Sequence, residues 1–180
     1  MTFDEKTLKK VIKEGGKRGV EIDGAATMGG LQYFCTKVDE PNGNWELLVK
    51  CVEAMNAEVD EAEEERKGGS GAIGKMVFSC DEHVLAVVAY VPADKTKECD
   101  AADWLKAVLN QYDGKFIQGD AGLAVGEIRS NPDAGKFTLK IRDEALPKAI
   151  AYLRSKGLFP EADSDSDSDF VMGDDYFDEM

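Results

Sequence analysis

Apolar residues recur at helical spacing in the first third of the chain. The first stripe consists of Leu8, Val11 and Ile12. It predicts a helix that starts near Thr2 and ends at residues 15–16, because a glycine pair favours a helix end. Residues 24–30 follow as a predicted glycine-broken loop.

A second helical stripe has an apolar residue at every third or fourth position. Its members are Trp45, Leu48, Val52, Met55 and Val59. All five share one helical face, so the pattern predicts a helix over residues 45–59. Asn44 precedes the stripe and has a side chain that is preferred at a helix N-cap. The helix leads through an acidic run into the glycine-rich residues 68–74.

Strand patterns flank this second helix. Residues 31–38 are rich in aromatic and β-branched side chains, which favour strands. Met76, Phe78 and Cys80 alternate with Val77 and Ser79, and residues 84–91 are apolar throughout. The continuous apolar run predicts a central strand that is covered on both faces. A helix follows, with Asp100 as its cap and Trp104 on its buried face.

The last third of the chain has a similar order of predicted elements. Residues 123–128 form a strand, and a turn separates them from a second strand over residues 136–141, in which apolar and polar side chains alternate. A helix over residues 146–153 has Pro147 in its first turn and stops at Gly157.

Residues 75–112 and 121–157 are therefore each predicted to have the order strand-strand-helix. This order predicts an α+β fold: a two-layer sandwich in which a mostly antiparallel sheet carries helices on one face, built from repeated strand-strand-helix units. Residues 1–160 form a single domain in this prediction, which is long enough to bury an ordinary hydrophobic core.

The composition is that of a globular chain without a membrane span. The 180 residues are 43% hydrophobic and 32% charged. The longest apolar run, residues 84–91, is far shorter than the ~20 residues that cross a bilayer. The first residues are charged and do not have the pattern of a secretory signal. We therefore expect a cytoplasmic protein, or a nuclear one, that does not bind membranes.

Charge is unevenly distributed along the chain. The net charge is −14, and residues 161–180 hold nine of the 36 acidic side chains and no basic one. Residues 1–160 keep 27 acidic against 22 basic side chains, so the domain has no basic excess. Proteins that bind nucleic acids carry such an excess, and we therefore expect no direct nucleic-acid binding.

Residues 161–180 are too charged to bury a core and are predicted to form a disordered acidic tail. Aromatic side chains are interleaved with its carboxylates. The residues predicted to contact a partner are Phe170, Asp174, Asp175, Tyr176, Phe177 and Asp178. Ser164 and Ser166 are phosphorylation candidates, because each has an aspartate three residues downstream, which suits an acidophilic kinase.

Three roles are open for this tail. Alternating acidic and apolar residues favour docking on a basic surface that has apolar pockets. A solvated tail that keeps the domain soluble explains the charge but needs no aromatic side chain. Folding back onto a basic surface of the domain itself is the third role, and it would be autoinhibitory.

No residue pattern indicates catalysis or a bound cofactor. Residues 69–74 match G-x-G-x-x-G, but the dinucleotide-binding motif follows a strand and opens a helix, whereas these residues follow an acidic run and precede a strand. His83, the single histidine, lies in a predicted turn. Cys80 is close to it in sequence, but the acidic residues nearby disfavour a reactive thiolate. We expect neither a catalytic nor a cofactor-binding residue.

Metal ligands follow no known pattern either. The four cysteines are Cys35, Cys51, Cys80 and Cys99, and no two of them form a C-x-x-C pair. Residues 163–169 alternate aspartate with serine but lack the glycine and the closing glutamate of an EF-hand loop. No metal site is therefore expected.

These observations favour a non-enzymatic intracellular adaptor or regulatory protein. In this hypothesis the acidic, phosphorylatable, aromatic-containing tail binds a basic protein or a ribonucleoprotein surface. One alternative is a small-molecule-binding or enzymatic domain that uses the glycine-rich loops at residues 24–30 and 68–74, which requires a concave pocket between them. The other is a structural subunit of a larger assembly, which requires an exposed apolar patch.

Overall fold

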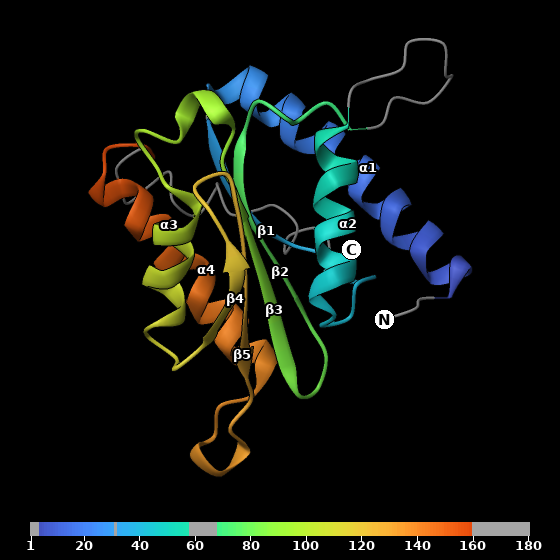
Figure 1. Ribbon diagram of the computed structural model, residues 1–180, viewed down its shortest axis with the longest axis vertical. Helices are drawn as coiled ribbons and strands as arrows, with labels where there is room; N and C mark the ends of the chain where they lie inside the picture. Colours follow the sequence, from blue (N-terminus) through green and yellow to red (C-terminus); the bar gives the residue numbers. More distant parts are fainter. Residues whose placement is uncertain (1–3, 31, 58–67, 160–180) are drawn as a thin grey trace.

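The structure is a computed structural model that describes residues 4–30, 32–57 and 68–159 (Figure 1). Its strands are β1 (Tyr33–Lys37), β2 (Gly74–Cys80), β3 (Val84–Tyr90), β4 (Lys115–Gly119) and β5 (Leu123–Arg129). Its α-helices are α1 (Glu5–Gly29), α2 (Trp45–Asn56), α3 (Ala101–Leu109) and α4 (Thr138–Ser155). Single 3-10 turns lie at Ala93–Lys95 and Pro132–Ala134. None of the helices in these ranges is both long enough and apolar enough to cross a membrane.

The described strands form one mixed sheet in the order β1-β2-β3-β5-β4. β1 runs parallel to β2, and the other neighbours are antiparallel. β2 and β3 form one hairpin, β4 and β5 form another, and the hairpins join where β3 pairs with β5. The predicted α+β class with a mostly antiparallel sheet is confirmed.

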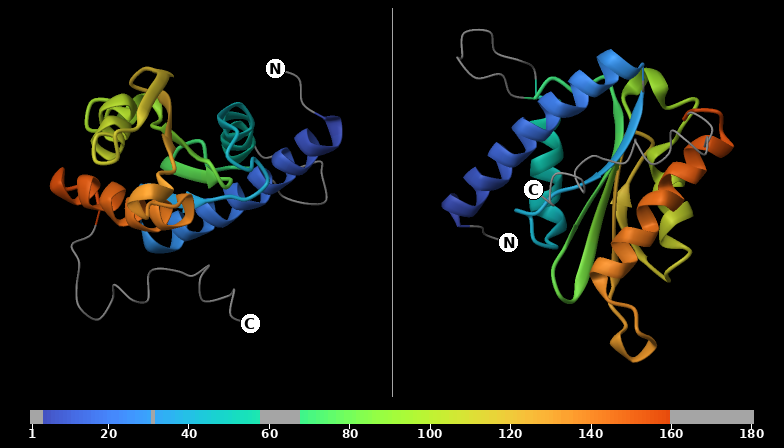
Figure 2. Two further views of the ribbon diagram at one scale, coloured as in Figure 1. Left: turned by 90° about the horizontal axis from the view of Figure 1, so that it is seen from below. Right: turned by 180° about the vertical axis from the view of Figure 1, so that it is seen from behind.

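Helices cover both faces of this sheet, as Figure 2 shows. α3 and α4 lie on one face and α2 lies on the other, where α1 packs against it. In this respect the structure differs from the prediction of helices on one face. Met76 and Phe78 of β2 enter the core beneath α3 and α4, whereas Val77 enters the core on the α2 side. Because the central strands are apolar on both sides, each side needs a covering layer.

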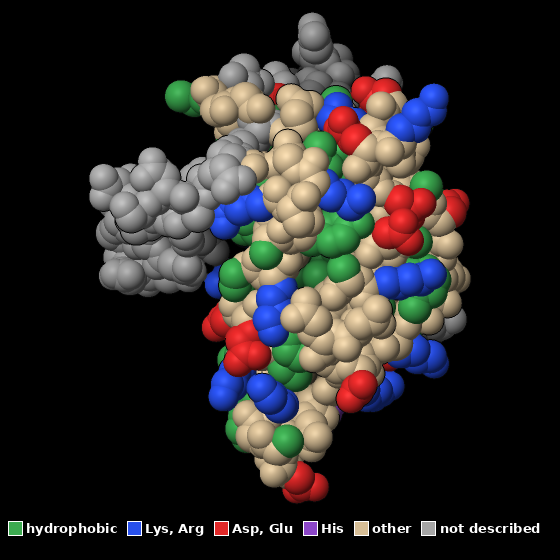
Figure 3. All heavy atoms as spheres, turned by 90° about the vertical axis from the view of Figure 1, so that its left-hand side faces the viewer, with side chains coloured by type: hydrophobic (Ala, Val, Ile, Leu, Met, Phe, Trp, Pro, Cys, Tyr) green, Lys and Arg blue, Asp and Glu red, His purple; other side chains and the backbone are tan. Residues whose placement is uncertain are grey.

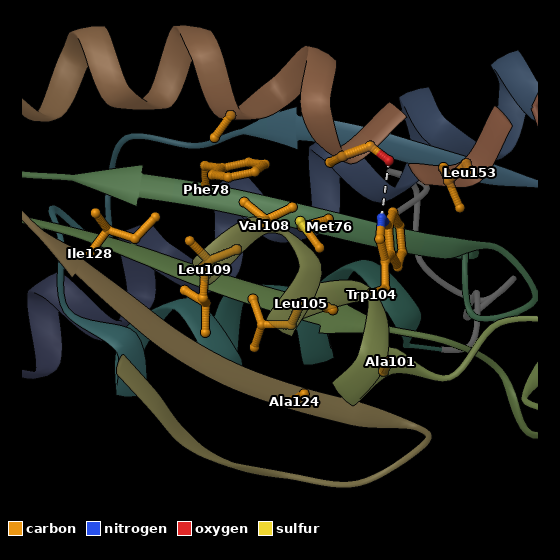
Figure 4. Close-up of a cluster of buried hydrophobic side chains, with 14 of the residues drawn as sticks. Met76, Phe78, Ala101, Trp104, Leu105, Val108, Leu109, Ala124, Ile128 and Leu153 are labelled. Atoms are coloured by element: carbon orange, nitrogen blue, oxygen red, sulfur yellow. Dashed lines mark hydrogen bonds between the residues drawn. The ribbon is translucent and has the colours of Figure 1, made fainter. Parts of the chain in front are cut away.

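Trp104 of α3 anchors the core beneath α3 and α4 (Figure 4). The side chain is fully buried, and its indole Nε1 donates a hydrogen bond to the Ala149 carbonyl oxygen of α4 at 3.1 Å. The Tyr33 ring of β1 meets the indole edge-on, with 6.0 Å between the ring centroids. The Tyr33 hydroxyl donates to a Glu98 carboxylate oxygen at 2.9 Å. Trp104 thus joins α3 both to α4 and to the edge strand β1.

The two predicted N-caps are present. The Asn44 side-chain oxygen accepts hydrogen bonds from the backbone N–H groups of Glu46 and Leu47 at 2.9 and 3.2 Å. An Asp100 carboxylate oxygen accepts from the backbone N–H of Asp103 at 3.1 Å. Both side chains therefore satisfy N–H groups that have no partner within their own helix.

The first helix is longer than predicted. α1 does not stop at residues 15–16 but continues to Gly29, and Gly30 follows in the left-handed conformation with a φ of 74°. Residues 24–29 are therefore helical, and the loop predicted there is wrong.

Two glycines of α1 allow its backbone to approach that of α2. A methyl group at Gly15 would run into the Cys51 carbonyl oxygen of α2. A methyl group at Gly19 would lie 2.6 Å from the Met55 carbonyl oxygen. The close contact buries Val11 and Ile22 of α1 against α2 and its surroundings. This packing offsets the roughly 1 kcal/mol by which each glycine weakens a helix interior.

The predicted strand over residues 136–141 is also wrong. α4 begins at Thr138, and its buried residues recur at helical spacing as Thr138, Ile141, Ala145, Ala149 and Leu153. Pro147 consequently lies inside α4 rather than in its first turn. The hairpin partner of β5 is instead β4, for which no strand was predicted. The order strand-strand-helix recurs as β2-β3-α3 and β4-β5-α4, but descent of the two units from one repeat stays a prediction.

Gly15→Ala and Gly19→Ala should each destabilise the protein by about 1–3 kcal/mol, the usual cost of overpacking a close contact. Gly24→Ala is the matched control in the same helix, because a methyl group there meets no atom within 4 Å. It should stabilise the protein by about 0.5–1 kcal/mol, since alanine is the better helix former. Urea unfolding followed by tryptophan fluorescence measures these changes. Equal stability of the three variants would contradict the close contact.

Candidate functional site

The predicted partner-binding residues of the tail lie outside the described residues. These are Phe170, Asp174, Asp175, Tyr176, Phe177 and Asp178, and the same holds for the phosphorylation candidates Ser164 and Ser166. Their roles stay predictions. Of the two glycine-rich segments, residues 24–29 belong to α1, whereas residues 68–73 form a loop between α2 and β2.

The loop of residues 68–73 is fastened to both helices of its layer. The Gly68 N–H donates a hydrogen bond to the Gly16 carbonyl oxygen of α1 at 2.9 Å. Ser70 is fully buried, and its N–H and hydroxyl both donate to the Met55 carbonyl oxygen of α2, at 3.0 and 2.7 Å. Gly68 has a φ of 74°, which a residue with a Cβ rarely adopts. The glycines thus shape a closed loop.

This loop encloses Lys75, the second residue of β2. The exposed fraction of Lys75 is 0%, which is unusual for a lysine. Its Nζ donates hydrogen bonds to Asn56 Oδ1 at 2.5 Å and to the carbonyl oxygens of Ser70 and Ile73 at 2.9 Å each. The same nitrogen lies 4.6 Å from the centroid of the Tyr90 ring. Lys75 therefore connects α2, the loop, β2 and β3.

All of these Lys75 partners are neutral. Three oxygens match the three N–H donors of an ammonium, and the aromatic face adds a weak attraction, but none carries a negative charge. Burial lowers the pKa of the Lys75 ammonium to about 7. A free amine with this pKa can act as a base or nucleophile near neutral pH. Because this one is enclosed and directed at neighbouring oxygens, its hydrogen bonds join the surrounding elements.

A hollow of roughly 470 Å³ lies at the start of α2. Its acidic lining residues are Glu40, Glu46, Asp81 and Glu127. A carboxylate oxygen of Asp81 accepts from two N–H groups of the β2–β3 turn, and the Glu127 carboxylate lies 3.6 Å from the Arg129 guanidinium. Nowhere in the described ranges do three His, Cys, Asp or Glu side chains gather to hold a metal ion. An acidic lining alone defines no ligand.

The cysteines and His83 differ in how far they are buried. Cys51 and Cys99 are buried, and burial raises the pKa of each thiol to about 12, so both stay protonated near neutral pH. Burial also raises the pKa of the Cys35 thiol. His83 is exposed in the turn between β2 and β3, as predicted. Neither Cys51 nor Cys99 is an activated thiolate, and Cys80, the cysteine closest to His83 in sequence, is partly buried.

α1 carries a positively charged outer face. Its exposed lysines are Lys6, Lys9, Lys10, Lys13 and Lys17. At 100° per residue they fall within an arc of about 100° on the helix. Ile12 borders them with 47% of its surface exposed. We call these five lysines together with Ile12 the α1 lysine face.

Sequence reasoning missed both the Lys75 cradle and the α1 lysine face. Lys75 precedes Val77 and Ser79 at a spacing of two residues, so it shares their side of β2. The signal that this side is buried was the double coverage predicted for the strand over residues 84–91. The helical spacing of the α1 lysines was visible too, but the helix was predicted to end before Lys17.

Comparisons with known proteins identify no family. No protein-family description matches the sequence, and no curated protein matches it. The C-Ala domain of alanyl-tRNA synthetase from Aquifex aeolicus is 15% identical, with a TM-score of 0.39, over 70% of this chain and 88% of that chain. The catalytic domain of the histidine kinase ThkA is 14% identical, with a TM-score of 0.24, over 74% of this chain and 99% of that chain. These scores are too low to indicate a shared fold or function.

Lys75→Met should alter how stability depends on pH. Because the folded-state pKa of Lys75 is lowered to about 7, the unfolded chain binds more protons than the folded chain above this pH. Stability from this residue therefore rises with pH. Relative to the variant, the native protein should gain about 2 kcal/mol between about pH 6.5 and about pH 8.5.

Urea unfolding at several pH values measures the difference in the free energy of unfolding between the native protein and Lys75→Met. The titration of all other groups largely cancels in this difference, because both proteins contain them. Lys115→Met removes an exposed lysine of β4 and is the control, which should keep the gain seen in the native protein. A constant difference between the native protein and Lys75→Met across this pH range would show that the buried amine does not change its charge.

Proposed function

We propose that this chain is a non-enzymatic intracellular adaptor or regulatory protein whose acidic tail, residues 161–180, binds a basic protein or a ribonucleoprotein surface. The observation that carries the proposal is the tail composition. Nine carboxylates, no basic side chain and interleaved aromatic residues follow a domain of near-balanced charge. A cytoplasmic or nuclear location fits such partners.

Charge and aromatic groups have separate tasks in this proposal. The carboxylates attract a basic surface over a distance and so increase the rate of encounter. Phe170, Tyr176 and Phe177 then enter apolar pockets of the partner and slow dissociation, as aromatic residues often do at interfaces. Phosphorylation of Ser164 or Ser166 adds roughly −1.5 to −2 charges per site and strengthens the attraction.

The domain can support this role through the surfaces that it offers to a partner. Its sheet is covered on both faces, so partners meet helices and loops. Exposed apolar side chains are present at Phe137 and Leu139, near the start of α4, with exposed fractions of 55% and 58%. The other large apolar side chains exposed among the described residues are Ile12 and Met28 of α1, whereas a structural subunit requires one contiguous apolar patch.

A quantitative pull-down at physiological salt tests the proposal with two full-length variants. One replaces the nine tail carboxylates by their amides, and the other replaces Phe170, Tyr176 and Phe177 by serine. Both should recover fewer basic proteins than the native chain. The aromatic variant keeps all tail charges, so it should associate at a native rate but dissociate faster, with an affinity roughly tenfold lower.

Leu139→Ser is the matched control, because it removes an exposed apolar side chain from the domain instead of the tail. It should recover the same basic proteins as the native chain. Equal recovery by the native chain and both tail variants would exclude the tail as the binding segment.

A further inference from the structure

Two acidic residues of α1, Glu14 and Glu21, are engaged away from the α1 lysine face, and the Glu21 carboxylate pairs with the Arg18 guanidinium at 3.0 Å. Glu14 accepts hydrogen bonds from the backbone N–H groups of Asp39 and Glu40, at 2.8 to 3.2 Å, and so turns away from the lysines. Within residues 4–30, 32–57 and 68–159, none of the five lysines forms an ion pair.

Five of the six cations between residues 136 and 156 contact a carboxylate or an aromatic ring, and the sixth, Lys140, is exposed. Lys136 and Arg142 contact carboxylates, and Lys148, Arg154 and Lys156 lie over aromatic rings. Figure 3 shows the side of the molecule that carries α3 and the C-terminal end of α4, where positive and negative side chains are interspersed. A polyanion therefore gains more from α1 than from α4, although α4 leads directly into the tail.

We propose that the α1 lysine face is the docking surface for residues 161–180 of the same chain. The tail offers nine carboxylates to five lysines, none of which forms an ion pair within the described residues. Its aromatic residues find apolar contact on Ile12 and on the methylene stems of the lysines, and their rings attract the ammonium groups. Charge and apolar character are thus complementary on both partners.

The geometry of the chain allows this docking. The C-terminal ends of α4 and α1 lie at the same end of the molecule (Figures 1 and 2). The 20 residues from 161 to 180 reach about 65 Å when extended, whereas the 25 residues of α1 span about 37 Å. The tail is therefore long enough to run back along α1 as far as Lys6.

This inference extends the proposed function, on which it rests only for the binding role of the tail. When the tail occupies α1, an external basic partner has to displace it. The affinity of the tail for the α1 lysine face then determines how tightly a partner must bind the tail to displace it. Neutralising that face should increase partner recovery without any change in the tail.

Zero-length carbodiimide crosslinking of the full-length protein tests the docking, because it joins only carboxylates and amines that touch. Tail carboxylates should couple to Lys6, Lys9, Lys10, Lys13 or Lys17 several-fold more than to the exposed Lys115 and Lys140. A mixture of isotope-labelled and unlabelled chains should give no mixed crosslinks. At about 0.5 M salt the crosslinks should largely disappear, since the Debye length falls to ~4 Å.

Ile12→Ser isolates the apolar contribution, because it leaves every lysine and carboxylate in place. It should lower the yield of crosslinks between the tail and the α1 lysines by roughly fivefold, because the tail loses its apolar contact with the partly exposed Ile12 side chain. Leu139→Ser is the matched control on α4 and should leave them unchanged. Circular dichroism verifies that both variants are folded.

Crosslinks shared evenly with Lys115 and Lys140 would overturn the proposal. Mixed-isotope crosslinks would overturn it in favour of a second copy of the chain as the occupant. Failure of the proposed function has a different signature, namely partner recovery that does not depend on the tail. The crosslinks involve no partner, so each idea can fail alone.

Discussion

The close contact between α1 and α2 determines much of this structure. Gly15 and Gly19 leave no side chain between the two backbones, so α1 lies against α2 along one narrow stripe. That stripe fixes the rotation of α1 about its axis, and the lysines on the opposite side are therefore directed to solvent. The contact also positions the Gly16 carbonyl oxygen, which accepts the N–H of Gly68 and fastens the loop that closes over Lys75. The lysine face and the buried lysine thus depend on the same packing.

The Lys75 cradle shows how a buried cation is tolerated without a counter-charge. Neutral oxygens replace the water molecules that an ammonium loses on burial, and a pKa of about 7 means that the proton can leave at little cost near neutral pH. A carboxylate at the site would hold the charge more firmly, but it would also require a second buried ion. The arrangement ties the end of α2 to β2 through Asn56, at the point where the chain enters residues 58–67.

Elements with strong local signals could be predicted from the sequence, and those governed by distant contacts could not. The caps Asn44 and Asp100 and the apolar run of β3 act within a few residues, so their pattern is sufficient. The glycines of α1 have the composition of a helix end, and only the position of α2 explains why the helix continues through them. Residues 137–141 alternate like a strand, yet Ile141 belongs to a helical series that extends to Leu153. For the candidate site, the sequence predicted that Lys75 belongs to a strand. It did not indicate which oxygens accept its hydrogen bonds, because these come from residues 56, 70 and 73.

A net charge also conceals how charge is arranged. Residues 1–160 carry a small acidic excess, which argued against a basic surface, yet α1 places five lysines within one arc of its outer face. A tail in the same molecule has an effective concentration of the order of millimolar, because it cannot diffuse away. If it occupies α1, any other polyanion, nucleic acid included, competes against that concentration at this face. The expected lack of nucleic-acid binding would then follow from occupancy of a basic surface rather than from the absence of one. The acidic tail would then limit which polyanions bind α1, and α1 would limit which basic partners bind the tail.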